Sequence, residues 1–75
     1  MIKYLAPKIT VNPGVRFGKP VIAGTRIPVD LVVGKIAGGM DISEVEKEFD
    51  LTEEEIRAAL RYAADLVAGE DVSLV

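Results

Sequence analysis

Two helix-start signals in the second half of the chain constrain its fold more than any other feature. In each of the stretches MDISEV and LTEEEI, a residue that can cap a helix is followed three positions later by a glutamate, which is the spacing of a capping box. Apolar residues flank each pair. In a capping box, the cap residue and the glutamate satisfy each other's free backbone amides, and flanking apolar residues form a hydrophobic staple. The cap and glutamate pairs are Asp41 with Glu44 and Thr52 with Glu55, and the staples are Met40 with Val45 and Leu51 with Ile56.

These signals predict helices over residues 41–49 and 52–68, preceded by a helix over residues 28–38. The earliest helix begins at a proline, places Asp30 at the positive end of its dipole and ends at two glycines. Gly69 predicts the end of the last helix. Apolar residues recur at helical spacing along one face of each helix, so we expect that face to form the core. The expected core positions are Val29, Val32, Val33, Ile36, Ile42, Val45, Phe49, Ile56, Leu60, Ala63 and Val67.

Before residue 28 the apolar residues form short runs separated by turn residues. ITV at 9–11 and VRF at 15–17 are predicted to pair across the turn Asn12-Pro13-Gly14, because proline sets the bend and glycine accepts a positive φ. PVIA at 20–23 is predicted to be an edge strand, since proline cannot donate to a sheet. The predicted fold class is mostly α, a trihelical helix-turn-helix core with a short N-terminal β-hairpin arm. The single domain 1–75 divides into an arm (1–27), a core (28–68) and a tail (69–75).

A chain of 75 residues without cysteine or histidine has few ways to stabilise a small core. Domains of this size commonly add disulfides, a metal ion or a partner subunit. Disulfides and the common zinc sites need residues that this chain lacks. We therefore expect no metal and no cofactor, and we expect a homodimer. No run of residues matches a signal peptide or a transmembrane span, which predicts a cytoplasmic protein without a membrane partner.

Charge is divided unevenly between the two halves of the chain. From residue 36 onward, eleven acidic residues oppose three basic ones, so this half is strongly acidic. Before that point six basic residues oppose a single acid, which makes the arm basic. Such asymmetry favours an acidic partner or the acidic half of a second copy, although a solvated surface of uneven sign explains it equally well. The basic residues of the first half are Lys3, Lys8, Arg16, Lys19, Arg26 and Lys35.

The stretch FGKPVIAGTRIPVD at 17–30 concentrates glycines, prolines and cations between apolar runs. It lacks the spacing of a nucleoside-triphosphate phosphate loop, so turns explain its glycines better. Turns do not explain why the cations Lys19 and Arg26 occur together with the sequence GTRIPV at 24–29. Together with ISEVEKEF and LTEEEIRAALRYAADL, this stretch resembles the bacterial and archaeal family called domain of unknown function 433. The resemblance covers about residues 9 to 68.

The resemblance implies a homeodomain-like trihelical domain with a short β-structured N-terminus. It identifies Gly18, Lys19, Pro20, Gly24, Thr25 and Arg26 with the family's signature loop. Some members resemble Vap-type antitoxins that are encoded beside a PIN-domain ribonuclease toxin. Members often carry a proline just before the leucine-threonine pair, whereas Asp50 stands there in this chain, which predicts a tighter turn between the last two helices.

Three functional classes follow, and binding a protein ranks first. An enzyme acting on a small-molecule substrate is the least expected, because Glu53, Glu54 and Glu55 stabilise a helix start without any catalytic role. DNA binding ranks second, since those same carboxylates repel phosphates where a recognition helix needs cations. Any DNA contact would use the arm, with Arg57 and Arg61 assisting.

The leading hypothesis is a dimeric antitoxin that neutralises a PIN-domain ribonuclease and regulates its own operon through DNA binding. PIN-type ribonucleases gather carboxylates around a divalent metal, and an arginine fork could pair with them. Arg26 and Arg16 are the candidates, with Lys19 weaker because it lacks the planar fork. The alternative role for Arg26 is a structural cap that bonds loop carbonyls and Asp30. The alternative function is a helix-turn-helix-like interaction module without a toxin partner.

Overall fold

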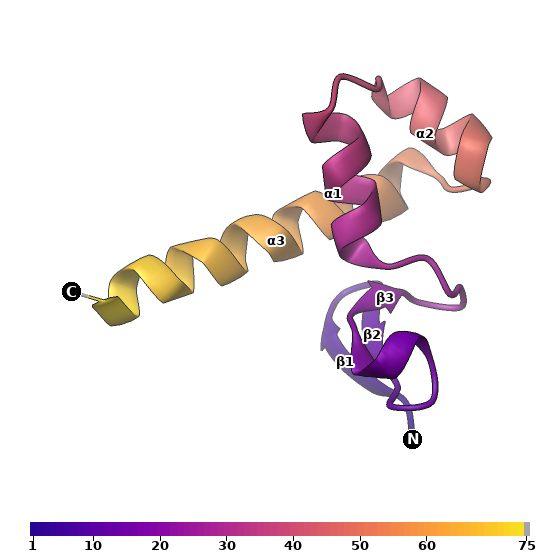
Figure 1. Ribbon diagram of the computed structural model, residues 1–75. Coiled ribbons are helices and arrows are strands. Elements are labelled where there is room, and N and C mark those ends of the chain that lie inside the picture. Colours follow the sequence, from indigo (N-terminus) through magenta and orange to yellow (C-terminus); the bar gives the residue numbers. More distant parts are fainter. Residues whose placement is uncertain (75) are drawn as a thin grey trace.

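The computed structural model describes the backbone of residues 1–74 and the side chains of residues 1–69. Three helices and a small antiparallel sheet make up the fold (Figure 1). The helices α1 and α2 lie beside the first part of α3. α2 follows the C-terminal end of α1, and the sheet lies at the N-terminal end of α1. The elements are β1 (Lys3–Ala6), β2 (Ile9–Val11), the 3₁₀ turn η1 (Arg16–Gly18), β3 (Val21–Ile22), α1 (Val29–Ala37), α2 (Ile42–Phe49) and α3 (Glu53–Leu74).

The predicted starts of α2 and α3 are confirmed, and hydrogen bonds show why the helices begin there. The Asp41 amide donates to the Glu44 carboxylate at 2.9 Å. At the second start the Thr52 amide donates to the Glu55 carboxylate at 2.9 Å, and the Glu55 amide donates to the Thr52 hydroxyl at 3.1 Å. These bonds satisfy amides that the first helical turn leaves free.

The predicted end of α3 is wrong, because the helix continues through Gly69 to Leu74. A glycine ends a helix when it adopts the left-handed conformation and its neighbours close a capping motif. Gly69 does not adopt a positive φ, and the residues after it continue the helix. Most of the expected tail 69–75 is therefore helical, and Val75 lies outside the described residues.

The β arm differs from the predicted hairpin. The turn at Asn12-Pro13-Gly14 is present, and the Gly14 amide donates to the Asn12 side chain at 2.9 Å. However, VRF does not form a strand, since Arg16 and Phe17 adopt left-handed φ values of 52° and 55°. The strand order is β1-β2-β3, with all pairs antiparallel. β2 therefore pairs with residues 3–6 and with β3, which is an edge strand as predicted.

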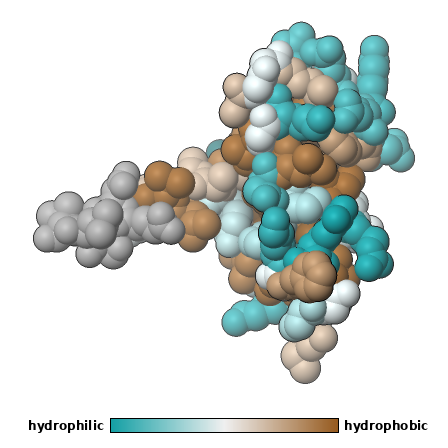
Figure 2. Space-filling view, viewed as in Figure 1, coloured by the Kyte–Doolittle hydropathy of each residue, from teal (hydrophilic) through white to brown (hydrophobic). Residues whose placement is uncertain are grey.

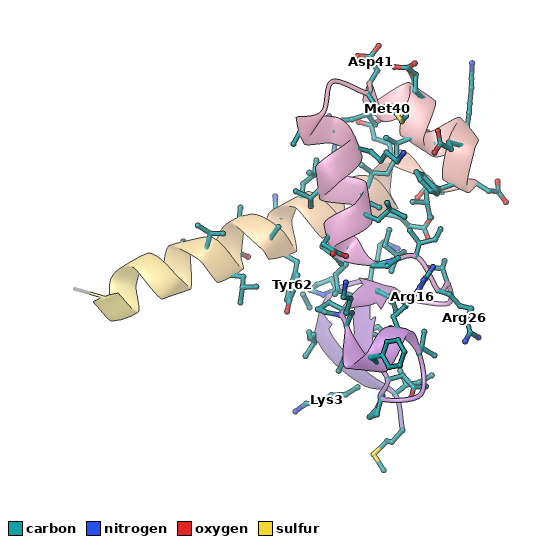
Figure 3. All side chains as sticks on the ribbon, in the orientation of Figure 1. Lys3, Arg16, Arg26, Met40, Asp41 and Tyr62 are labelled. Atoms are coloured by element: carbon teal, nitrogen blue, oxygen red, sulfur yellow. The ribbon has the colours of Figure 1, made fainter. Side chains whose placement is uncertain are left out.

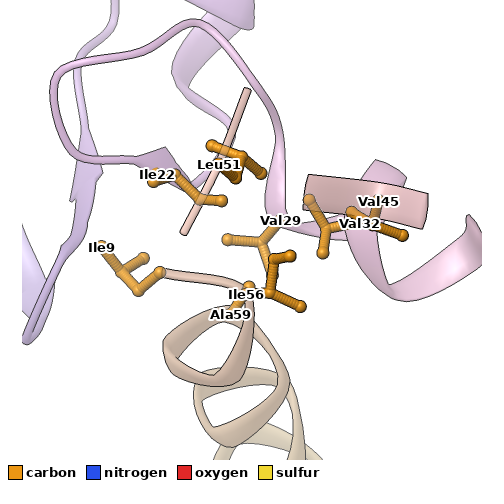
Figure 4. Packing of buried hydrophobic residues seen from close by; sticks show 8 residues of the cluster. All are labelled: Ile9, Ile22, Val29, Val32, Val45, Leu51, Ile56 and Ala59. Atoms are coloured by element: carbon orange, nitrogen blue, oxygen red, sulfur yellow. The ribbon is translucent and has the colours of Figure 1, made fainter. Parts of the chain in front are cut away.

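A single hydrophobic cluster joins the sheet to the helices (Figure 4). The sheet contributes Ile9 and Ile22, which are fully buried, so the arm is part of the core. Along α3 the burial decreases toward the C-terminus. Leu60 is partly buried and packs against the cluster, Ala63 is partly buried, and Val67 is 56% exposed, so the predicted stripe is wrong at Val67. The buried cluster comprises Ile9, Ile22, Val29, Val32, Val45, Leu51, Ile56 and Ala59. No helix in the described part of the chain has the length and apolar character needed to cross a bilayer.

Candidate partner-binding site

The loop between β3 and α1 holds Arg26 on a well-defined turn. Gly24 has a φ of 78°, and the Thr25 amide donates to the Ile22 carbonyl at 3.0 Å, which closes a tight turn. The Thr25 hydroxyl donates to that same carbonyl at 2.7 Å and accepts from the Ile27 amide at 3.0 Å. Both flanks of the loop are thus fixed by hydrogen bonds. Arg26 projects from a preorganised loop, which lowers the entropy lost when a partner binds.

Arg16 lies against this loop from the turn that precedes β3 (Figure 3). Its Nε donates to the backbone carbonyl of Arg26 at 3.0 Å, so the two guanidinium-bearing residues are held beside each other. Both side chains are exposed. The arrangement concentrates two planar, permanently charged donor groups on one side of the molecule.

The alternative role of Arg26 as a structural cap is filled by other residues. Asp30 pairs with the Lys19 ammonium at 3.3 Å, and both side chains are mostly exposed. The loop carbonyl is bound by Arg16 rather than by Arg26. Within the described part of the chain the Arg26 side chain forms no ion pair and no hydrogen bond. It is therefore free to bind an external carboxylate or phosphate.

Phe17 stands out beside these cations because its side chain is 102% exposed. A bulky residue rarely adopts a left-handed φ, yet Arg16, Phe17 and Gly18 do so in succession, with φ values of 52°, 55° and 80°. Residues held in this region cost on the order of 1–3 kcal/mol each. The turn thus presents an aromatic ring to solvent at a cost in stability. We call Arg16, Phe17, Lys19 and Arg26 the basic loop site.

Replacing Phe17 with asparagine should raise the free energy of unfolding by about 1 kcal/mol, because asparagine tolerates the left-handed region and no buried contact is lost. Chemical denaturation measures this change. Phe17→Ala is the matched control: it removes the ring but keeps a Cβ in the same strained conformation, so it should bring no gain. An asparagine variant that is no more stable than the alanine variant would show that the turn is unstrained.

The other two predicted cations lie elsewhere. Arg57 and Arg61 line a groove of about 400 Å³ between α3 and the β1–β2 turn. This groove has no lining residue in common with the groove that Arg16 and Lys19 line. The Arg57 Nε also pairs with the Glu53 carboxylate at 2.8 Å, one helical turn away. The structure thus brings together Arg16, Lys19 and Arg26, and separates Arg57 and Arg61 from them.

The helix-turn-helix element presents an acidic rather than a basic helix start. α2 and α3 are joined by residues 50–52, and Asp50 caps α2 in the left-handed conformation with a φ of 55°. The first turn of α3 carries Glu53, Glu54 and Glu55. Glu54 pairs with Lys8 at 3.3 Å, but the Glu54 side chain remains 79% exposed, so carboxylates still dominate this surface.

Phe17 is the member of the basic loop site that was not predicted from the sequence. The run VRF has the composition of a short strand, so its phenylalanine was expected to lie in a sheet and not on an exposed turn. The available signal was Gly18 directly after Arg-Phe, since a glycine that needs positive φ often belongs to a turn that includes its neighbours.

The fold and this surface define a small trihelical domain with an antiparallel sheet packed into its core and an exposed basic loop. A family model described as Protein of unknown function (DUF433) matches residues 9–63, more than half of the chain. The chain therefore belongs to this family, and the basic loop site lies within the matched residues. A search of curated proteins gives no match.

The fold is similar to the crystal structure of Rv2018 from Mycobacterium tuberculosis, with a TM-score of 0.63 and 27% sequence identity. The match covers 69% of this chain but only 24% of that chain, so the matched part spans about a quarter of the length of that protein.

Proposed function

We propose that this protein is the antitoxin of a type II toxin–antitoxin pair and that it neutralises a PIN-domain ribonuclease through the basic loop site. The observation that carries the proposal is the unpaired, exposed Arg26 side chain, which a hydrogen-bonded loop holds beside Arg16. PIN-type ribonucleases are the candidate partners because some relatives of this family resemble antitoxins encoded beside them.

The chemistry of such a contact follows from the guanidinium group. An arginine fork can donate two parallel hydrogen bonds to one carboxylate, and this bidentate pair is roughly twice as strong as a neutral hydrogen bond. The carboxylates that hold a divalent metal in a nuclease are therefore suitable acceptors for Arg26. Once paired with arginine they are less available to the metal, and Phe17 adds apolar contact beside the charged groups. The proposal assigns a binding role rather than a catalytic one.

The proposal is tested with the ribonuclease encoded beside this chain. A PIN-domain reading frame should adjoin this one, and its purified product should lose RNA cleavage when the present protein is added. Arg26→Lys should weaken inhibition by about tenfold or more, because lysine keeps the charge but loses the bidentate fork. The melting temperature should not change, since the Arg26 side chain makes no hydrogen bond or ion pair within the described residues.

Arg57→Lys is the matched control, as it makes the same chemical change outside the basic loop site and should leave inhibition intact. Unchanged inhibition by Arg26→Lys would assign the metal-facing role to Arg16 instead. The absence of a PIN-domain neighbour, or a neighbour that the protein does not inhibit, would contradict the proposal and favour an interaction module without a toxin partner.

Regulation of its own operon is the second part of the proposal, supported by the α2–turn–α3 arrangement. Phosphate contacts supply much of the affinity of a DNA-binding protein, and the three glutamates at the start of α3 oppose them. DNA contact therefore uses the basic loop site, with Arg57 and Arg61 as further phosphate ligands. A dimer would present two such sites.

A further inference from the structure

The second half of α3 leaves the body of the molecule without any partner. Figure 1 shows the helix extending away from α1, α2 and the sheet toward the C-terminus. Every residue from 64 to 69 is exposed, including Leu66 at 51% and Val67 at 56%. Short helical segments are marginal in water unless an apolar face is packed. This part of α3 thus has an apolar face that the chain itself does not cover.

An apolar groove lies beside the base of the projecting helix. It has a volume of about 460 Å³ and runs between α1 and α3. Figure 2 shows hydrophobic residues gathered on the described surface where the helix leaves the body. α1 contributes Val33 and Gly34 to the groove, and α3 contributes Tyr62, Ala63 and Leu66.

The glycine at position 34, which lines this groove, indicates independently that another molecule can approach α1 closely. It lies inside α1, where glycine costs about 0.5–1 kcal/mol relative to alanine. Its backbone does not require glycine, because it has no positive φ, and a Cβ built there would meet no atom within 4 Å. The fold of a single chain therefore gives no reason for glycine at this position. Close approach of an external group would give one.

We propose that two copies of the chain associate through this region, with their α3 helices antiparallel about a twofold axis. Leu66 and Val67 of each copy would lie in the groove between α1 and α3 of the other, and Gly34 would permit the close approach. The occupant is a second copy because one stretch of α3 supplies both the groove wall and the protruding apolar side chains. Such a self-complementary patch meets the requirement of a twofold interface.

The surfaces that would meet carry little net charge. Lys19 at the rim of the groove is paired with Asp30, which also lines it, and residues 62–69 of α3 carry Asp65 as their single charged side chain. Such a patch suits the apolar centre of an interface, where charged residues are depleted. This association does not depend on what the basic loop site binds.

Sedimentation equilibrium of the full chain at micromolar concentrations tests the proposal. The wild type should give twice the mass of one chain. Leu66→Gln and Gly34→Ala should each raise the dimer dissociation constant by at least about tenfold, the first by placing an amide in an apolar contact and the second by filling the approach path. Gly34→Ala should not destabilise the isolated chain, since alanine favours a helix and the site has room, so weaker association cannot be ascribed to unfolding.

Leu5→Gln is the matched control, because it makes the same exchange at an exposed leucine of β1 that lines neither this groove nor the neighbouring one. It should leave the dissociation constant unchanged. A monomeric wild type would overturn the proposal. A dimer that withstands both Leu66→Gln and Gly34→Ala would overturn it as well, and would favour association through the edge of β1 instead.

Discussion

Replacing Ile56 with alanine should lower the free energy of unfolding by about 2–5 kcal/mol. Ile56 is fully buried and belongs to the cluster that joins α3 to both the sheet and α1. Truncation removes apolar area and leaves a cavity among neighbours that can collapse only in part. Because a core of this size rarely supplies more than about 3–5 kcal/mol, the variant should be substantially unfolded at room temperature. Urea denaturation followed by circular dichroism measures the loss.

Leu60→Ala and Glu54→Ala are the comparison variants on the same helix. Leu60 is only partly buried, so its truncation should cost clearly less than that of Ile56, about 1–2 kcal/mol. Glu54 is exposed and pairs only with Lys8 on the surface, so its loss should stay within about 0.5 kcal/mol. Equal losses for Ile56→Ala and Leu60→Ala would mean that the buried face of α3 lies elsewhere.

Reversing both arginines of the basic loop site, with Arg16→Glu and Arg26→Glu together, should abolish the proposed inhibition of a PIN-domain ribonuclease. Like charges placed together across an interface cost several kcal/mol, which corresponds to a loss of affinity of about a hundredfold or more. The variant should also lose any DNA binding, since it removes cations that would contact phosphates. Inhibition and gel-shift assays measure the two losses separately. Loss of DNA binding alone, with full inhibition retained, would contradict the role of these arginines in toxin binding.

The matched control reverses two exposed lysines elsewhere, Lys3→Glu with Lys47→Glu, and changes the net charge by the same amount. It should inhibit the ribonuclease like the wild type, because neither lysine belongs to the basic loop site. Equal losses in the two double variants would show that inhibition responds to net charge rather than to a defined contact.

Local signals in the sequence determined the helical half of the protein. The capping boxes at Asp41 and Thr52 predicted the starts of α2 and α3 to within one residue, and the glycine pair at 38–39 predicted the end of α1. These predictions succeed because the responsible interactions join residues a few positions apart, as the bonds between Thr52 and Glu55 show. The turn at Gly24 and Thr25 is also determined locally, since its hydrogen bonds join residues at most three positions apart.

Only the tertiary structure decided which parts of these elements are covered. Leu60 and Val67 continue the same apolar pattern as Ile56, but Leu60 is only partly buried against the cluster and Val67 is exposed, because the packed elements lie beside the first part of α3. The same holds for the basic loop site. The sequence placed Arg16, Lys19 and Arg26 in one arm. Lys19 pairs with Asp30 and Arg16 bonds a loop carbonyl, so of these three cations Arg26 is the one whose side chain has no hydrogen bond or ion pair within the described residues. These outcomes depend on contacts between residues that are distant in sequence, and neither helical periodicity nor composition records such contacts.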